Sequence, residues 1–125
     1  MQQVPDVSFL SDEVKLWFAK AIAGMVVADG RVDNTEVEFV KAAIGFLTRQ
    51  EDVATIMSII KQKQIPPLGV SKIESKVAFT MLKFLAEIMV VDHKLTESEV
   101  LFFSQVGKLL GFTTHDSGTA LENRT

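Results

Sequence analysis

Acidic side chains gather at two places in this sequence where we expect one helix to end and the next to begin. The acids at these two corners are Asp29, Asp33, Glu36, Asp92, Glu97 and Glu99. Hard divalent cations bind several oxygen ligands from carboxylates and loop carbonyls, and a helix end supplies free carbonyl groups. The corners therefore have the chemistry to hold a divalent cation such as calcium.

The same acids also have a purely structural interpretation. Asp33 suits the N-cap of a helix, and Glu36 can bond back to the N-cap amide, which is the capping-box pattern. Glu99 repeats this pattern at the second corner. An EF-hand loop is excluded, because the twelfth position of a loop that starts at Asp29 needs a glutamate and is occupied by Val40. Cation binding and helix capping both stay open as interpretations.

Both corners lie in a segment that the chain contains twice. Residues 20–47 align without a gap with residues 83–110, and eight of the 28 aligned positions are identical. One of the identical pairs is Asp29 with Asp92. We therefore expect two helix–corner–helix units, related by an internal pseudo-twofold axis, that bury their apolar faces against each other.

The apolar spacing predicts an all-α fold, a compact bundle of about five main helices. The helical period from Val14 to Val26 predicts the first helix, with Ser11 as its N-cap and Gly30 as its C-cap. The other four are expected at about residues 33–47, 51–61, 72–91 and 97–110. The fourth is apolar around nearly its whole circumference, so we expect it at the centre of the bundle.

Composition and length favour one cytoplasmic domain. The 125 residues divide into an N-terminal lead-in at 1–10, a helical domain at 11–112 and a disordered tail at 113–125. The absence of cysteine excludes disulfides and thiolate chemistry. A net charge of −3 argues against nucleic acid as the partner. No apolar stretch is long enough to span a bilayer, and the N-terminus has no signal-peptide pattern.

Residues for catalysis are scarce, so we expect no enzyme. The sequence has no P-loop, HExxH or GxSxG motif. Glu87, within an apolar helix, and His93, beside Asp92, are isolated titratable groups. A hydrolase built on either is the weakest interpretation, and pairing of Glu87 with Lys83 explains the acid more simply.

Adjacent aromatic residues on the last helix suggest a contact surface. Phe102 and Phe103 point about 100° apart on a helix, so they cannot easily share one inward stripe. Core packing is the first interpretation of both rings, and the alternative is that one of them is exposed and marks a partner surface or a homodimer interface. Two kinds of partner therefore stay open, another protein and a second copy of this chain.

The motif at the corners resembles the TerB (tellurite-resistance) family over roughly residues 12–111. In the first copy it consists of Asp29, Gly30, Arg31, Val32, Asp33 and Glu36. In the second copy it consists of Asp92, Leu95, Thr96 and Glu99. The second copy departs from the first at His93, which stands where Gly30 stands.

The resemblance implies a helical bundle with an internal pseudo-twofold. It also implies a non-enzymatic binding module, associated with resistance to tellurium oxyanions and other stresses, that acts through protein contacts. Its partners would be other stress-resistance or membrane-associated proteins. The alternative that the family suggests is a protein that binds or senses divalent metal ions through its acidic corners.

Overall fold

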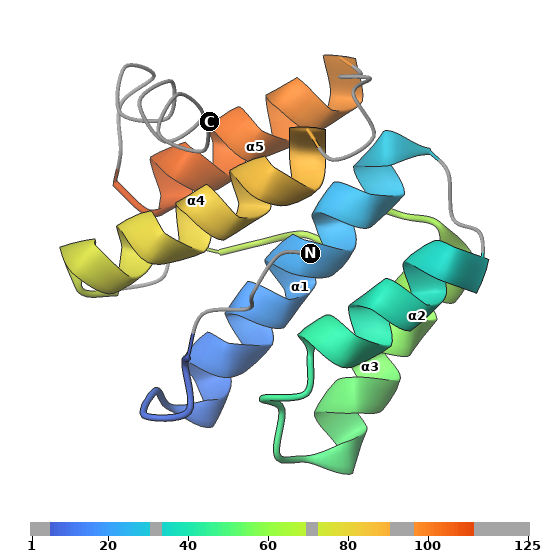
Figure 1. Cartoon of the computed structure of the whole chain (residues 1–125), viewed down its shortest axis with the longest axis horizontal. Helices are drawn as coiled ribbons and strands as arrows, with labels where there is room; N and C mark the ends of the chain where they lie inside the picture. The colour runs from blue at the N-terminus through green and yellow to red at the C-terminus, as the bar shows by residue number, and fades with distance from the viewer. Residues whose placement is uncertain (1–5, 31–33, 70–72, 91–96, 112–125) are drawn as a thin grey trace.

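A computed structural model describes residues 6–30, 34–69, 73–90 and 97–111 of the chain. Five helices, coloured along the chain in Figure 1, make up most of these ranges. They are α1 (Asp12–Asp29), α2 (Asn34–Ala43), α3 (Gln50–Gln62), α4 (Ser75–Val90) and α5 (Glu97–Leu109). The described residues contain no strand, and the predicted all-α fold is confirmed.

The ends of α1 lie where the sequence places them. The hydroxyl of Ser11 accepts a hydrogen bond from the backbone N–H of Val14 at 3.3 Å, as an N-cap does. At the other end Gly30 adopts a left-handed conformation, with φ of 80°, and its N–H donates to the carbonyl of Val27. Both predicted caps of the first helix are confirmed.

Two other boundaries differ from the prediction. α2 ends at Ala43 instead of Leu47, and residues 44–46 form tighter turns in which Leu47 N–H bonds the carbonyl of Ile44 at 3.0 Å. α4 begins at Ser75, because the carbonyl of Glu74 accepts its first helical hydrogen bond, at 2.8 Å. The sequence from Ser71 to Glu74 also has the spacing of a capping box, but Ser71 lies outside the described residues.

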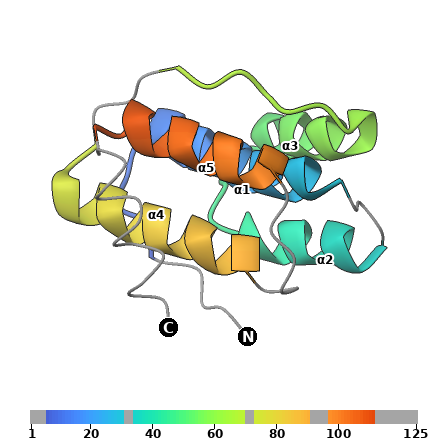
Figure 2. The same cartoon turned by 90° about the horizontal axis from the view of Figure 1, so that it is seen from above.

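The helices form two layers with α1 at the centre (Figure 2). α5, α1 and α3 lie side by side in one layer, and α4 and α2 lie in the other. α1 packs against all four of its neighbours, whereas α4 packs against α1 and α5. The prediction that the fourth helix is central is therefore wrong. α1 can be surrounded because its buried surface includes small residues, namely Ala19, Ala21, Ala23, Gly24 and Ala28.

Residues 6–10 fill the second layer between α2 and α4. Val7 is only 2% exposed and belongs to a core cluster that contains Ala43 of α2 and Met81 of α4. α2 and α4 do not pack extensively against each other, whereas α1 and α5 do. The lead-in thus contributes to the core. The internal pseudo-twofold repeat stays a prediction from the sequence.

The contact between α1 and α5 depends on Gly24. A Cβ atom at this position would lie 2.2 Å from Cζ of Phe102, far inside van der Waals contact. The missing side chain lets the Phe102 ring pack directly on the α1 backbone. Phe102 is 4% exposed and Phe103 is 2% exposed. Core packing, the first interpretation of these two rings, is therefore confirmed, and the alternative that one of them faces solvent is wrong.

Gly24→Ala is expected to lower the free energy of unfolding by about 1–3 kcal/mol, the usual range for overpacking a dense core. Chemical denaturation measures this change. Gly69→Ala is the matched control, because a Cβ there meets no atom within 4 Å, and it is expected to be neutral or slightly stabilising. Combining Gly24→Ala with Phe102→Leu should cost less than the sum of the single substitutions. Strict additivity would contradict the proposed contact.

Candidate functional site

The described residues include only part of the two acidic corners. Asp33, Asp92 and His93 lie outside the described ranges, and Asp29 is described only as the last backbone position of α1. Glu36 is half-buried in the first turn of α2. Whether the two corners assemble ligand sets for a cation therefore stays a prediction.

The two glutamates of the second corner have different surroundings. Glu97 is exposed at the start of α5, whereas Glu99 is 2% exposed and lies among core side chains. Residues two positions apart on a helix do not share a face, so these carboxylates diverge. Within the ranges that the structure describes, no group of three or more acidic or histidine side chains has the arrangement of a metal site.

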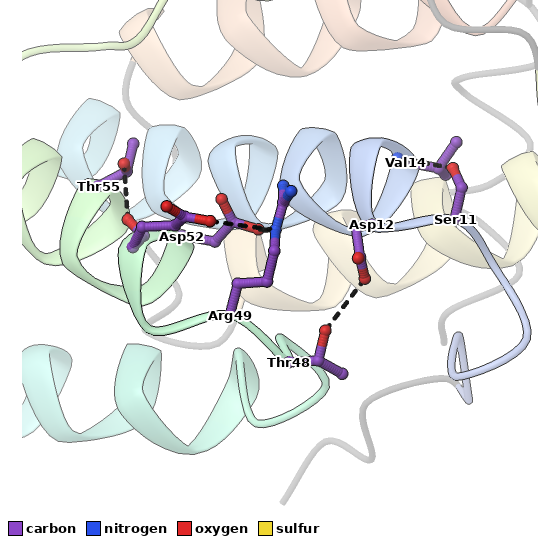
Figure 3. Close-up of polar contacts among 8 residues, drawn as sticks. Ser11, Asp12, Val14, Thr48, Arg49, Asp52 and Thr55 are labelled. Carbon is purple, nitrogen blue, oxygen red and sulfur yellow. Dashed lines mark hydrogen bonds and ion pairs between the residues drawn. The ribbon is translucent and has the colours of Figure 1, made fainter.

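A polar cluster joins the N-terminal ends of α1 and α3 (Figure 3). The hydroxyl of Thr48 donates to Oδ1 of Asp12 at 3.0 Å, which ties the α2–α3 loop to the first turn of α1. Arg49 Nε donates to Oδ2 of Asp52 at 2.8 Å and lies 3.8 Å from Oε1 of Glu51. These contacts place three carboxylates and one guanidinium at one end of the bundle.

The electrostatics of this cluster indicate a structural role. The Asp52 carboxylate is buried, and its hydrogen bond raises the pKa of Arg49 above the ordinary value. Arg49 precedes α3 without a side-chain cap of its own, so its contact with Asp52 fastens the first turn instead. An arginine bound in this way is neither a nucleophile nor a base. No sequence signal had identified Arg49, three residues earlier, as the partner of Asp52.

An open groove of about 300 Å³ lies between the lead-in and α4. Buried Val7 and Met81 contribute to it from opposite sides. The other lining residues are Asp6, Phe9, Lys76, Val77 and Thr80. A second groove, of about 260 Å³, lies on the other side of Asp6 and Val7, next to Ala42 and Phe46. Neither groove was predicted from the sequence.

A third groove, also of about 260 Å³, lies beside the two prolines that follow α3. Lys20 of α1, Ile59 of α3 and Ile65 all line it, together with Pro66 and Pro67. Its polar lining consists of amide, hydroxyl and ammonium groups, without a carboxylate or histidine. This combination gives no acid–base pair for catalysis.

Exposed apolar side chains gather on the first turns of α5. Leu101 is 63% exposed and Val100 is 42% exposed, although both aromatic residues that follow them are buried. The exposed apolar side chains of α5 are therefore not Phe102 or Phe103 but the two residues that precede them. Such neighbouring apolar groups often mark interaction surfaces.

Comparisons with protein-family models, with curated proteins and with solved structures found no match to this chain. The resemblance to the TerB family therefore rests on the corner motif alone. Of the helices in the described ranges, none combines the length and the apolar character needed to cross a bilayer. The geometry of the grooves and faces is thus the main guide to function.

Arg49→Met is expected to lower the melting temperature, because the buried Asp52 carboxylate loses the donor that compensates its burial. Lys41→Met is the matched control. Lys41 pairs with Glu38 at 3.5 Å on an exposed helix face, where an ion pair contributes little. Thermal unfolding followed by circular dichroism checks both variants. Equal melting temperatures for the two would contradict the role assigned to Arg49.

Because Glu97 and Glu99 diverge, we expect these two carboxylates to form no joint cation site, and addition of millimolar Ca²⁺, Mg²⁺, Mn²⁺ or Zn²⁺ to the metal-stripped protein should change its melting temperature only if the remaining corner acids bind the ion. A bound ion at 100 times its dissociation constant would stabilise the fold by about 2.7 kcal/mol. Differential scanning calorimetry measures the shift. A shift that Asp29→Asn abolishes would instead establish the corners as cation sites.

Proposed function

We propose that the chain is a non-enzymatic, TerB-like binding module that acts through protein contacts. The observation that carries this proposal is the groove between the lead-in and α4, which combines an apolar floor with a charged rim. The resemblance and the sequence add the cellular context. The module would act in the cytoplasm in stress or tellurite resistance, with partners among stress-resistance or membrane-associated proteins. These finer points belong to the same proposal.

The shape and lining of the groove suit an amphipathic protein segment. Val7 and Met81 are buried, whereas Phe9 is 66% exposed and so offers an apolar wall without a cover. Methionine adapts its shape to different partners because its side chain is flexible and polarisable. A helix or extended segment with apolar anchors would bury these side chains.

Opposite charges on the rim favour one orientation of the partner. Asp6 and Lys76 both line the groove and are exposed. The Asp6 carboxylate accepts hydrogen bonds from the Ser8 hydroxyl at 2.7 Å and from the Ser8 N–H at 3.0 Å. These bonds lower the pKa of Asp6, so the group is ionised at neutral pH. A partner with a basic residue near Asp6 and an acidic residue near Lys76 would complement the rim.

The polar groups of the groove support a binding role rather than catalysis. Its one hydroxyl, that of Thr80, donates to the carbonyl of Lys76 at 2.9 Å on the same helix. The only carboxylate among the lining residues is that of Asp6, which bonds to Ser8 instead, and no histidine lies there to act as a base for Thr80. The groove therefore has recognition groups without the nucleophile–base pair that covalent catalysis uses.

Short peptides selected from a random library against the full chain should bind this groove. They are expected to carry apolar anchors between a basic and an acidic residue. Phe9→Ser should weaken the binding of these peptides about tenfold or more, because it removes one exposed aromatic anchor. Ile65→Ser is the matched control, because Ile65 is also an exposed apolar residue but lines a different groove. Isothermal titration calorimetry measures the affinities.

The location of binding is checked by amide chemical shifts on peptide addition. Changes should concentrate at residues 6–9 and 76–81. Asp6→Lys should select against the basic residue of the peptide, because it reverses one charge of the rim. Peptides whose shifts map elsewhere, or equal losses in Phe9→Ser and Ile65→Ser, would overturn the proposed site.

A further inference from the structure

We propose that the outer face of α5 binds the same face of a second copy of this chain, with the two helices antiparallel. This inference is independent of the groove, because the lining of the groove contains no residue of α5. The contact would be isologous, since each copy contributes the same residues across a twofold axis.

The outer face is one continuous stripe of α5. Four exposed residues follow one another at intervals of four, four and three positions, namely Glu97, Leu101, Gln105 and Lys108. This spacing places them on one side of the helix. The opposite side packs into the bundle through Glu99, Phe102, Phe103, Val106 and Gly107. Because α5 lies at the edge of its layer (Figure 1), the stripe faces away from α1.

The charges at the two ends of the stripe select an antiparallel arrangement. The acidic Glu97 lies in the first turn of α5 and the basic Lys108 in the last turn. Two parallel copies would bring like charges together. Two antiparallel copies bring Glu97 of each copy to Lys108 of the other, which gives two ion pairs and specifies the partner as a second copy.

The same register places the exposed apolar side chains at the centre. If Glu97 lies opposite Lys108 of the other copy, Leu101 lies opposite Ser104, and Val100 lies opposite Gln105. The two copies of Leu101 are then separated by about 4.5 Å along the helix axes, the rise of three residues. The two Leu101 side chains contact each other across the twofold axis, so that each covers the other. In the single chain this side chain is 63% exposed. The small Ser104 leaves room for this contact.

Sedimentation velocity of the full chain at low ionic strength, from micromolar to near-millimolar concentration, tests the proposal. We expect a reversible monomer–dimer equilibrium that Leu101→Ser abolishes. Ile65→Ser is the control, because Ile65 is also exposed but lines the third groove, which contains no residue of α5. Circular dichroism verifies that each variant keeps the helical content of the parent.

Charge reversal gives the sharper test. Glu97→Lys and Lys108→Glu alone should each weaken the dimer about tenfold, because each replaces two exposed ion pairs by two like-charge contacts. The double variant Glu97→Lys/Lys108→Glu should restore the parental affinity. A chain that stays monomeric throughout the range, or a double variant that fails to restore association, would overturn the proposal.

Discussion

The close approach of the Phe102 ring to the α1 backbone at Gly24 is the constraint on which the bundle depends. A helix with neighbours on every side must let several other helices approach its backbone closely. α1 meets this requirement with small residues and with a position that has no Cβ at all. Dense packing of this kind tolerates little change in volume. The position of α5 depends on it directly, and α4 packs against both α1 and α5.

Much of this architecture could be predicted from local sequence features. The caps at Ser11 and Gly30 depend on a few neighbouring residues, and both predictions hold. The helical period also identified every helix of the described ranges. The relative placement of the helices could not be predicted in the same way. α4 is the more apolar helix by composition, yet small side chains, not apolar ones, allow α1 to be surrounded.

The candidate site was harder to predict for the same reason. A groove arises where segments distant in the sequence meet, and Phe9 gives no periodic signal that pairs it with Met81. The exposed surface on α5 was predicted on the right helix but at the wrong residues. The angle between Phe102 and Phe103 suggested that one ring could be exposed, whereas contact with Gly24 buries Phe102 and the core face of α5 is wide enough for both rings. The acidic corners involve residues beyond the described ranges, and their role stays a prediction.

The placement of Val7 between α2 and α4 links the groove to the integrity of the core. The segment that supplies Asp6 and Phe9 to the groove also inserts Val7 into the second layer. Release of this segment would remove a groove wall and open the interior in a single event. Any partner held by Phe9 would oppose that release, and by thermodynamic linkage a well-packed second layer would favour the partner to the same extent. Binding of such a partner and local unfolding of the N-terminal segment would therefore be two thermodynamically coupled equilibria.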